Sequence, residues 1–243
     1  MMLAYGATHP GRRRENNEDA FLLAPHLHAA ILADGMGGHS CGEVGSAITI
    51  EAIAGYLTVP EAGLEPAELA REAIRAANRQ VLDAAKLRTE CKGMGSTVVM
   101  AMWHATALTI ANVGDSRAYL YRDAQLRQLS YDQNFANELR TSLGFSEERV
   151  RNIPNRNVLT MAVGTFDHVL VRTHSETLVP GDRILLCSDG LYGPVDESAM
   201  LAILAANPAP EPAVQALIEH ANLNGGPDNV TAILLHYSDQ AND

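Results

Sequence analysis

Aspartate next to glycine, at the end of a short apolar run, is the feature that most constrains the fold of this chain. It occurs at Ile31-Leu-Ala-Asp34-Gly35, at Ile110-Ala-Asn-Val-Gly-Asp115 and at Ile184-Leu-Leu-Cys-Ser-Asp189-Gly190. Short apolar runs of this length are typical of buried strands, and an Asp-Gly step is typical of the turn that ends one. We therefore expect sheets whose strand ends carry carboxylates.

Two further acidic turns stand next to expected strands. Asp228 lies just before the strand that begins at Val230, and Glu18 with Asp19 lies just before the strand that begins at Ala20. Strand ends converge on one rim of a sheet, so all six acids, Glu18, Asp19, Asp34, Asp115, Asp189 and Asp228, come within reach of one another. Carboxylates a few ångströms apart repel one another unless a cation lies between them. Oxygen donors favour Mg²⁺ or Mn²⁺ over zinc or copper, although any single Asp-Gly pair taken alone is more often a plain turn.

The order of the remaining elements predicts an α+β fold. Strands are expected at 20–24, 29–33, 96–103, 106–113, 117–122, 125–129, 168–173, 183–188 and 230–236, and helices at 40–57, 66–88, 196–206 and 210–223. Strands in consecutive blocks with helices in pairs between them favour antiparallel sheets over a βαβ array. No linker or repeat interrupts the chain, so we expect one domain over 1–243. Residues 131–160 are polar and lack clean periodicity, which is typical of a functional flap.

Composition excludes several kinds of partner. The 243 residues are 47% hydrophobic and 19% charged, with 29 acidic against 18 basic residues and a formal charge of -11. That balance argues against nucleic acid or an anionic membrane as the main partner. No window holds the ~20 apolar residues needed to span a bilayer, so a cytoplasmic protein is expected. The three cysteines, Cys41, Cys91 and Cys187, suggest neither a disulfide framework nor a zinc site, and Cys187 is expected to be a buried thiol.

With these motifs in order, the chain resembles a known family, the metal-dependent (Mg/Mn) serine/threonine protein phosphatases of the PPM, or type 2C, group. The resemblance covers about 11–235 and is closest to the bacterial branch. It rests on Arg14-x-Asn-Asn-Glu-Asp19, Ala33-Asp-Gly-Met-Gly-Gly-His39, Gly95-Ser-Thr97, Val113-Gly-Asp-Ser-Arg117, Cys187-Ser-Asp-Gly190 and Gly226-Pro-Asp-Asn-Val-Thr231. Several motifs in the same order are a far stronger signal than any one alone.

The resemblance implies a four-layer α-β-β-α sandwich, in which two antiparallel sheets are flanked by helix pairs and hold two Mn²⁺ or Mg²⁺ ions at one end. Asp34 is expected to bridge both ions, Asp189 and Asp228 to complete the shell of the first, and Glu18 with the Gly35 carbonyl to hold the second. Asp115, with Asp189, matches the position of a third, weaker ion. Arg14 is expected to bind the phosphate, and Asp19 to orient metal-bound water.

This site implies hydrolysis of phosphoserine and phosphothreonine on proteins by direct attack of a water activated by two metals. Partners would be phosphoproteins and a cognate kinase, and the protein is expected to be a monomer. Met36 stands where many eukaryotic relatives have a histidine proposed as the general acid, and His39 is more simply an ordinary loop histidine. Within a flap at about 131–165, Met161 replaces a common arginine and Asp132-Gln-Asn134 replaces Asp-His-Ser or Asp-His-Thr, which leaves substrate preference open.

Two other functions remain as alternatives. A catalytically silent member of the same family would serve as a regulatory or scaffold protein, and a missing metal-binding aspartate would favour it, but none is missing. A nucleotide-binding enzyme is the second alternative, because Gly35-Met-Gly-Gly38 precedes a helix that can cradle phosphate. That segment lacks the full Gly-x-Gly-x-x-Gly spacing and the βαβ context of a dinucleotide site.

Overall fold

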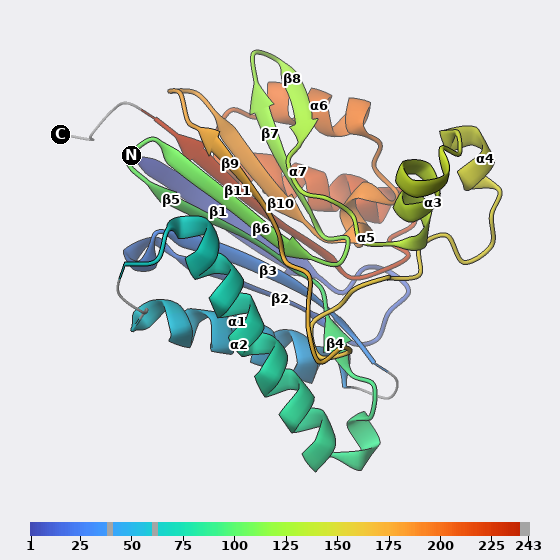
Figure 1. The fold of residues 1–243 in the computed structure, drawn as a ribbon. Coiled ribbons are helices and arrows are strands. Elements are labelled where there is room, and N and C mark those ends of the chain that lie inside the picture. The colour runs from blue at the N-terminus through green and yellow to red at the C-terminus, as the bar shows by residue number, and fades with distance from the viewer. Residues whose placement is uncertain (38–40, 60–62, 239–243) are drawn as a thin grey trace.

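Two antiparallel sheets form the centre of the molecule (Figure 1). The structure is a computed structural model that describes residues 1–37, 41–59 and 63–238. The first sheet has the strand order β1 (Met2–His9), β11 (Val230–Tyr237), β10 (Arg183–Cys187), β7 (Arg117–Arg122) and β8 (Gln125–Gln128). The second has the order β2 (Asp19–Ala24), β3 (Ala29–Met36), β5 (Val98–His104), β6 (Ala107–Val113) and β9 (Arg172–Thr177), and the short β4 (Gly95–Ser96) pairs with the end of β3.

A pair of helices covers the outer face of each sheet. Helices α1 (Gly42–Thr58) and α2 (Pro66–Leu87) pack on the second sheet, and α6 (Glu197–Ala206) and α7 (Pro210–Leu223) pack on the first (Figure 1). One apolar core lies between the sheets, and two more lie beneath the helix pairs. The predicted four-layer α-β-β-α sandwich is confirmed, and its antiparallel sheets exclude the βαβ context of a dinucleotide site.

Burial on both faces explains why the strands read as apolar runs and not as alternating ones. In β5, Val98 and Met100 join the core beneath α1 and α2, whereas Val99 and Ala101 join the core between the sheets. All four side chains are fully buried. Sheets covered on both faces give near-continuous apolar sequences, which is what marked these strands in the sequence.

Several elements differ from the predicted ones. β1 was not expected, because its sequence is mixed in polarity. It is an edge strand that pairs only with β11, and many of its residues are partly exposed. β9 begins at Arg172, four residues later than the predicted strand at 168–173. The polar segment after β8 holds two helices, α3 (Phe135–Leu143) and α4 (Glu147–Arg151), which project from one end of the sandwich (Figure 1). Ser40, where the first predicted helix begins, lies outside the described residues.

The cysteine prediction is wrong for two of the three residues. Cys41, just before α1, and Cys91, at the end of the short helix η2 (Thr89–Cys91), form a disulfide across 50 residues of sequence. Spacing along the chain gives no sign of this pairing, because it arises only when α1 packs beside the segment that leads into β4. Cys187 is buried in β10 as predicted. Among the described residues, no helix is long and apolar enough to cross a membrane.

Candidate metal centre

The acidic turns meet at one end of the sandwich, around a single cavity of about 340 Å³. Seven of the eight predicted site residues line it, namely Arg14, Glu18, Asp34, Gly35, Asp115, Asp189 and Asp228. They come from the turn before β2, the end of β3, the turn after β6, the start of the short helix α5 (Asp189–Tyr192) and the turn before β11. The eighth, Asp19, pairs with Asp34 in the register of β2 and β3 and lies behind the cavity.

Asp34 is held in place by its backbone. Its N–H donates to Thr97 Oγ1 at 3.1 Å, and its carbonyl accepts from the Thr97 N–H at 2.8 Å and from Ser96 Oγ at 2.9 Å. Burial and the neighbouring carboxylates of Asp19 and Asp189 raise the pKa of Asp34 well above its usual value. Burial and the carboxylate of Asp228 raise the pKa of Asp189 as well. Ionised carboxylates at this spacing require a compensating cation.

Glu18 packs against two glycines whose lack of a side chain is essential. A β-carbon on Gly42, the first residue of α1, would lie 2.5–2.8 Å from the Glu18 carboxylate, and the Gly42 N–H donates to that carboxylate. A β-carbon on Gly35 would lie 2.1 Å from the Gly42 carbonyl oxygen and 2.5 Å from that of Glu18. Three backbone segments are therefore in direct contact, and the start of a helix faces a carboxylate.

Arg14 and Asp228 form an ion pair at the rim of the cavity, with Nη2 and Oδ2 2.8 Å apart. The Arg14 side chain is 52% exposed, so its guanidinium keeps donors free for an anion from solvent. The Asp228 carboxylate raises the pKa of Arg14 further, and the arginine stays charged. Exposed ion pairs of this kind contribute little to stability, which leaves Arg14 free to exchange partners.

Asp19 is buried between the two sheets. Its Oδ2 accepts hydrogen bonds from Ser188 Oγ at 2.8 Å and Thr231 Oγ1 at 2.6 Å. Burial raises the pKa of Asp19 to about 7 against the opposing effect of these two hydroxyls. The carboxylate thus joins the start of β2 to the ends of the strands in the other sheet, directly behind Asp34.

Asp115 connects the cavity to the segment that carries α3 and α4. Its Oδ2 accepts from Asn134 Nδ2 at 3.0 Å, and Asn134 Oδ1 accepts from the backbone N–H of Asn137 to cap α3. Burial raises the pKa of Asp115 to about 7. One amide side chain therefore holds both an acid of the cavity and the first turn of a helix outside it.

Sequence reasoning missed the side chains that hold this arrangement together. They are Thr97, Asn134, Ser188, Asn229 and Thr231. Asn229 Oδ1 accepts from the Glu18 N–H at 2.8 Å, and its Nδ2 donates to the carbonyls of Pro10 and Asn16. All five lie within motifs already quoted, and Ser188, Asn229 and Thr231 share a motif with an acid of the site. Spacing alone, however, does not say which polar neighbour bonds to which strand.

The donor set fits hard divalent cations. All four side chains proposed for the two principal ions are carboxylates, and oxygen is the donor that Mg²⁺ and Mn²⁺ prefer. Within the described ranges, no three His, Cys, Asp or Glu side chains stand in an arrangement that already closes around an ion. The acids instead surround an open cavity, with the raised pKa values of Asp34 and Asp189 as the electrostatic sign of charge that a cation would offset.

Known proteins share both the sequence and the fold. Residues 6–232 match the model of the family described as protein phosphatase 2C. The serine/threonine phosphatase stp of Listeria welshimeri is 36% identical over 234 residues, which is 94% of this chain and 93% of that protein. The crystal structure of serine/threonine phosphatase Stp1 from Staphylococcus aureus superposes with a TM-score of 0.90 at 31% identity, covering 98% of this chain and 96% of that one.

A second solved structure bears on the cavity. It is the catalytic domain of the serine/threonine protein phosphatase PstP in complex with two manganese ions, with a TM-score of 0.87 and 30% identity, covering 98% of this chain and 99% of that one. Family model, relative and structures agree along almost the whole sequence. The chain therefore belongs to the protein phosphatase 2C family.

Proposed function

We propose that the protein hydrolyses phosphoserine and phosphothreonine on proteins, using two Mn²⁺ or Mg²⁺ ions held in the acidic cavity. The observation that carries this proposal is that the cavity brings together five carboxylates and one arginine from five separate segments of the chain. Relatives named as serine/threonine phosphatases, and the related PstP domain in complex with two manganese ions, support the same activity.

Each lining residue has a proposed role. Asp34 would contact both ions, Asp189 and Asp228 would complete the shell of one, and Glu18 with the Gly35 carbonyl would hold the other. These roles require groups that reach a common space, and all five residues line the same cavity. Two bound divalent ions lower the pKa of water to near neutrality and offset the charge on the phosphoryl oxygens.

The chain's own groups then position the substrate. Arg14 sits at the rim with an exposed guanidinium, where it binds two phosphoryl oxygens and keeps the phosphorus in line for attack. Asp19, held behind Asp34 by two hydroxyl donors, would orient metal-bound water. Met36 lines the cavity and has no proton to give, so it cannot supply the proton that the leaving alkoxide needs. His39 lies outside the described residues.

Asp115 and Asp189 both line the metal cavity, and they would hold a third, weaker ion. Asn134 holds Asp115 in position and links this site to α3. The silent scaffold alternative is not favoured, because every acid of the proposed set is present and lines the cavity. A cognate serine/threonine kinase and a monomeric state complete the proposal.

The test is hydrolysis of p-nitrophenyl phosphate and of a phosphothreonine peptide, with and without Mn²⁺. We expect turnover that depends on Mn²⁺ and that Asp34→Asn abolishes while circular dichroism stays unchanged. Val59→Ala, an exposed substitution just after α1 and more than 20 residues from any proposed site residue in sequence, is the control and should keep the wild-type rate. Turnover that persists in EDTA, or an Asp34→Asn enzyme with full rate, would overturn the assignment.

A further inference from the structure

A second pocket lies beneath the projecting helices α3 and α4, next to the metal cavity. We call it the flap pocket; its volume is about 230 Å³, and Arg117, Asp132, Arg140, Arg151, Arg156 and Tyr192 are among its lining residues. Asp115, Asn157 and Asp189 line both this pocket and the metal cavity. The two spaces are therefore neighbours that share a wall, and a peptide held at the metals extends into the flap pocket.

The arginines of this pocket differ in what already binds them. Arg117 makes two hydrogen bonds to Asp132 Oδ2, at 3.0 and 2.7 Å, and the carboxylate of Asp132 offsets its charge. Arg151 pairs with Glu147 at 2.7 Å, with both side chains more than 60% exposed. Arg140 has no hydrogen bond or ion pair to another described residue, and Arg156 donates only to the backbone carbonyl of Arg151. Two guanidinium groups thus line the pocket without a hydrogen-bonded carboxylate. The nearby carboxylate is Glu147, whose pKa is lowered first by its partner Arg151 and then by Arg140.

The opposite wall is acidic only until cations bind. Asp115 and Asp189 belong to the proposed metal site, where bound ions offset their charge. The outer wall then holds Arg140, Arg151 and Arg156 against Glu147, an excess of positive charge in a chain whose formal charge is -11. Arginine pairs with carboxylate and phosphate oxygens through two parallel hydrogen bonds.

We propose that the flap pocket is a specificity subsite that binds an acidic side chain, or a second phosphate, close in sequence to the phosphorylated residue. Arg140 and Arg156 make the contacts. This inference rests on the proposed phosphatase function and adds the class of substrate. The pocket keeps a fixed relation to the metals because Asn134 bonds both to Asp115 and to the first turn of α3.

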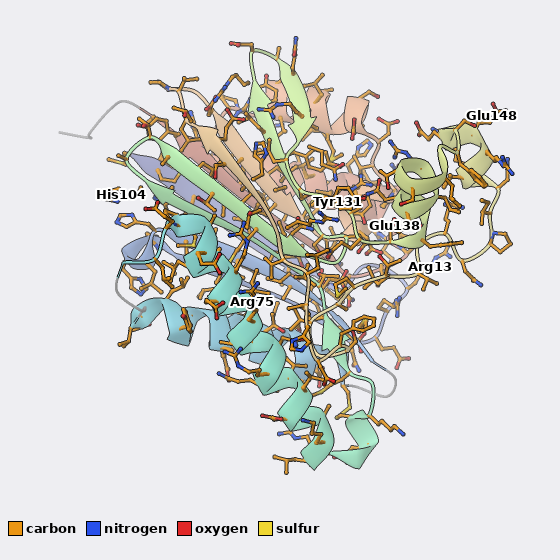
Figure 2. The ribbon with its side chains drawn as sticks, viewed as in Figure 1. Arg13, Arg75, His104, Tyr131, Glu138 and Glu148 are labelled. Carbon is orange, nitrogen blue, oxygen red and sulfur yellow. A yellow bond between two sulfur atoms is a disulfide. The ribbon has the colours of Figure 1, made fainter. Side chains whose placement is uncertain are left out.

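The position of the pocket favours a group of the substrate over an isolated anion from solvent. Figure 2 shows Tyr131 where the segment leaves the sandwich, Glu138 on α3 and Glu148 at the outer end of α4. Neither of these two acids lines the pocket, whereas Arg140 of α3 and Arg151 of α4 do. Of the acids of α3 and α4, only Glu147 lines it.

The test compares two phosphothreonine peptides with the Mn²⁺-loaded enzyme. One carries glutamate at two positions on each side of the phosphothreonine, and the other carries glutamine there. We expect kcat/KM to favour the acidic peptide by about fivefold, as two partly exposed charge contacts would give. The preference should shrink as ionic strength rises. Arg140→Gln combined with Arg156→Gln should bring the ratio close to one, whatever the absolute rates.

The matched control is Arg149→Gln. Arg149 lies on α4, between Arg140 and Arg156 in the sequence. Its guanidinium packs over the Phe145 ring, 3.6 Å from the ring centroid, and Arg149 does not line the pocket. It should keep the wild-type ratio. Arg140→Glu with Arg156→Glu should reverse the preference, toward a peptide with lysine at the same positions.

The outcomes distinguish failure of the proposed subsite from failure of the proposed phosphatase function. A wild-type enzyme that hydrolyses both peptides equally, or an Arg140→Gln and Arg156→Gln enzyme that keeps the preference, overturns the subsite alone. An equal loss in Arg149→Gln does so too, because the effect would then be general surface charge. Absence of Mn²⁺-dependent turnover on p-nitrophenyl phosphate overturns the proposed function instead.

Discussion

The substitution Gly42→Ala adds a single carbon atom, and we expect it to weaken metal binding without destabilising the fold. The added β-carbon would lie 2.5–2.8 Å from the atoms of the Glu18 carboxylate, well inside contact distance. The backbone of Gly42 has no room to retreat, because its carbonyl oxygen already lies against Gly35, where a β-carbon would come within 2.1 Å of it. The movable group is the carboxylate at the end of a flexible side chain.

The size of the effect follows from how precisely a metal ligand must be placed. Relief of the contact moves the carboxylate by roughly half an ångström or more, whereas ligand distances in metal sites hold to about 0.2 Å. Loss of one well-placed ligand contact lowers metal affinity by about tenfold or more. The helix itself loses nothing, since alanine is a better helix former than glycine by about 1 kcal/mol.

Gly55→Ala in the same helix is the control. A β-carbon on Gly55 meets nothing within 4 Å, so the substitution should raise the melting temperature by about 2–4 °C without touching the site. Titration calorimetry of Mn²⁺ into the metal-free protein then gives the affinity of each variant. We expect weaker binding for Gly42→Ala and wild-type binding for Gly55→Ala. If Gly42→Ala binds Mn²⁺ with wild-type affinity and stoichiometry, Glu18 is not a ligand and the assignment fails.

Three further results are expected. Thiol titration of the unreduced, denatured protein should find one free thiol, from Cys187, and reduction should expose all three and lower the unfolding free energy by up to about 4 kcal/mol for a loop of this length; three thiols before reduction would disprove the disulfide. Thr231→Val removes a donor from the buried Asp19 carboxylate and should cost about 2 kcal/mol in chemical denaturation, where an unchanged midpoint would refute the hydrogen bond. Mn²⁺ at 100 times its dissociation constant should stabilise the fold by about 2.7 kcal/mol, measured as a melting shift that EDTA reverses; no shift would argue against binding to the folded state.

The acids of the site were predictable because strand geometry places them. An apolar run ends where the chain leaves the core, and a carboxylate at that point projects onto the rim that neighbouring strands share. Asp34, Asp115 and Asp189 follow this rule, each directly after a buried segment. The pattern does not say how deeply each acidic side chain is buried. Asp19 and Glu18 are adjacent in sequence, yet one is buried behind the cavity and the other lines it, because successive residues of an extended chain point to opposite sides.

The contacts that hold the site were not predictable, because they join segments far apart in the sequence. Gly42 looked like an ordinary residue near a helix start, and only its packing against Glu18 shows why a side chain is excluded. The disulfide between Cys41 and Cys91 has the same origin, since it depends on α1 lying beside the segment before β4. Long-range pairing of this kind follows from topology, which periodicity in one sequence does not determine.

The sequence Asp132-Gln-Asn134 differs from the motif that is usual in the family, yet its three side chains hold the start of the flap in place. Asp132 holds Arg117, Gln133 accepts from the Gly114 N–H at 2.8 Å and donates to the Leu170 carbonyl, and Asn134 holds Asp115. All three side chains are buried and fully engaged, so this stretch anchors the flap and leaves no polar group free to choose a substrate. The proposed subsite lies farther along the segment, at the exposed arginines of α3 and of the loop after α4. If Arg140 and Arg156 select the substrate, substitution there should change the preference without disturbing the proposed metal ligands, because neither residue lines the metal cavity.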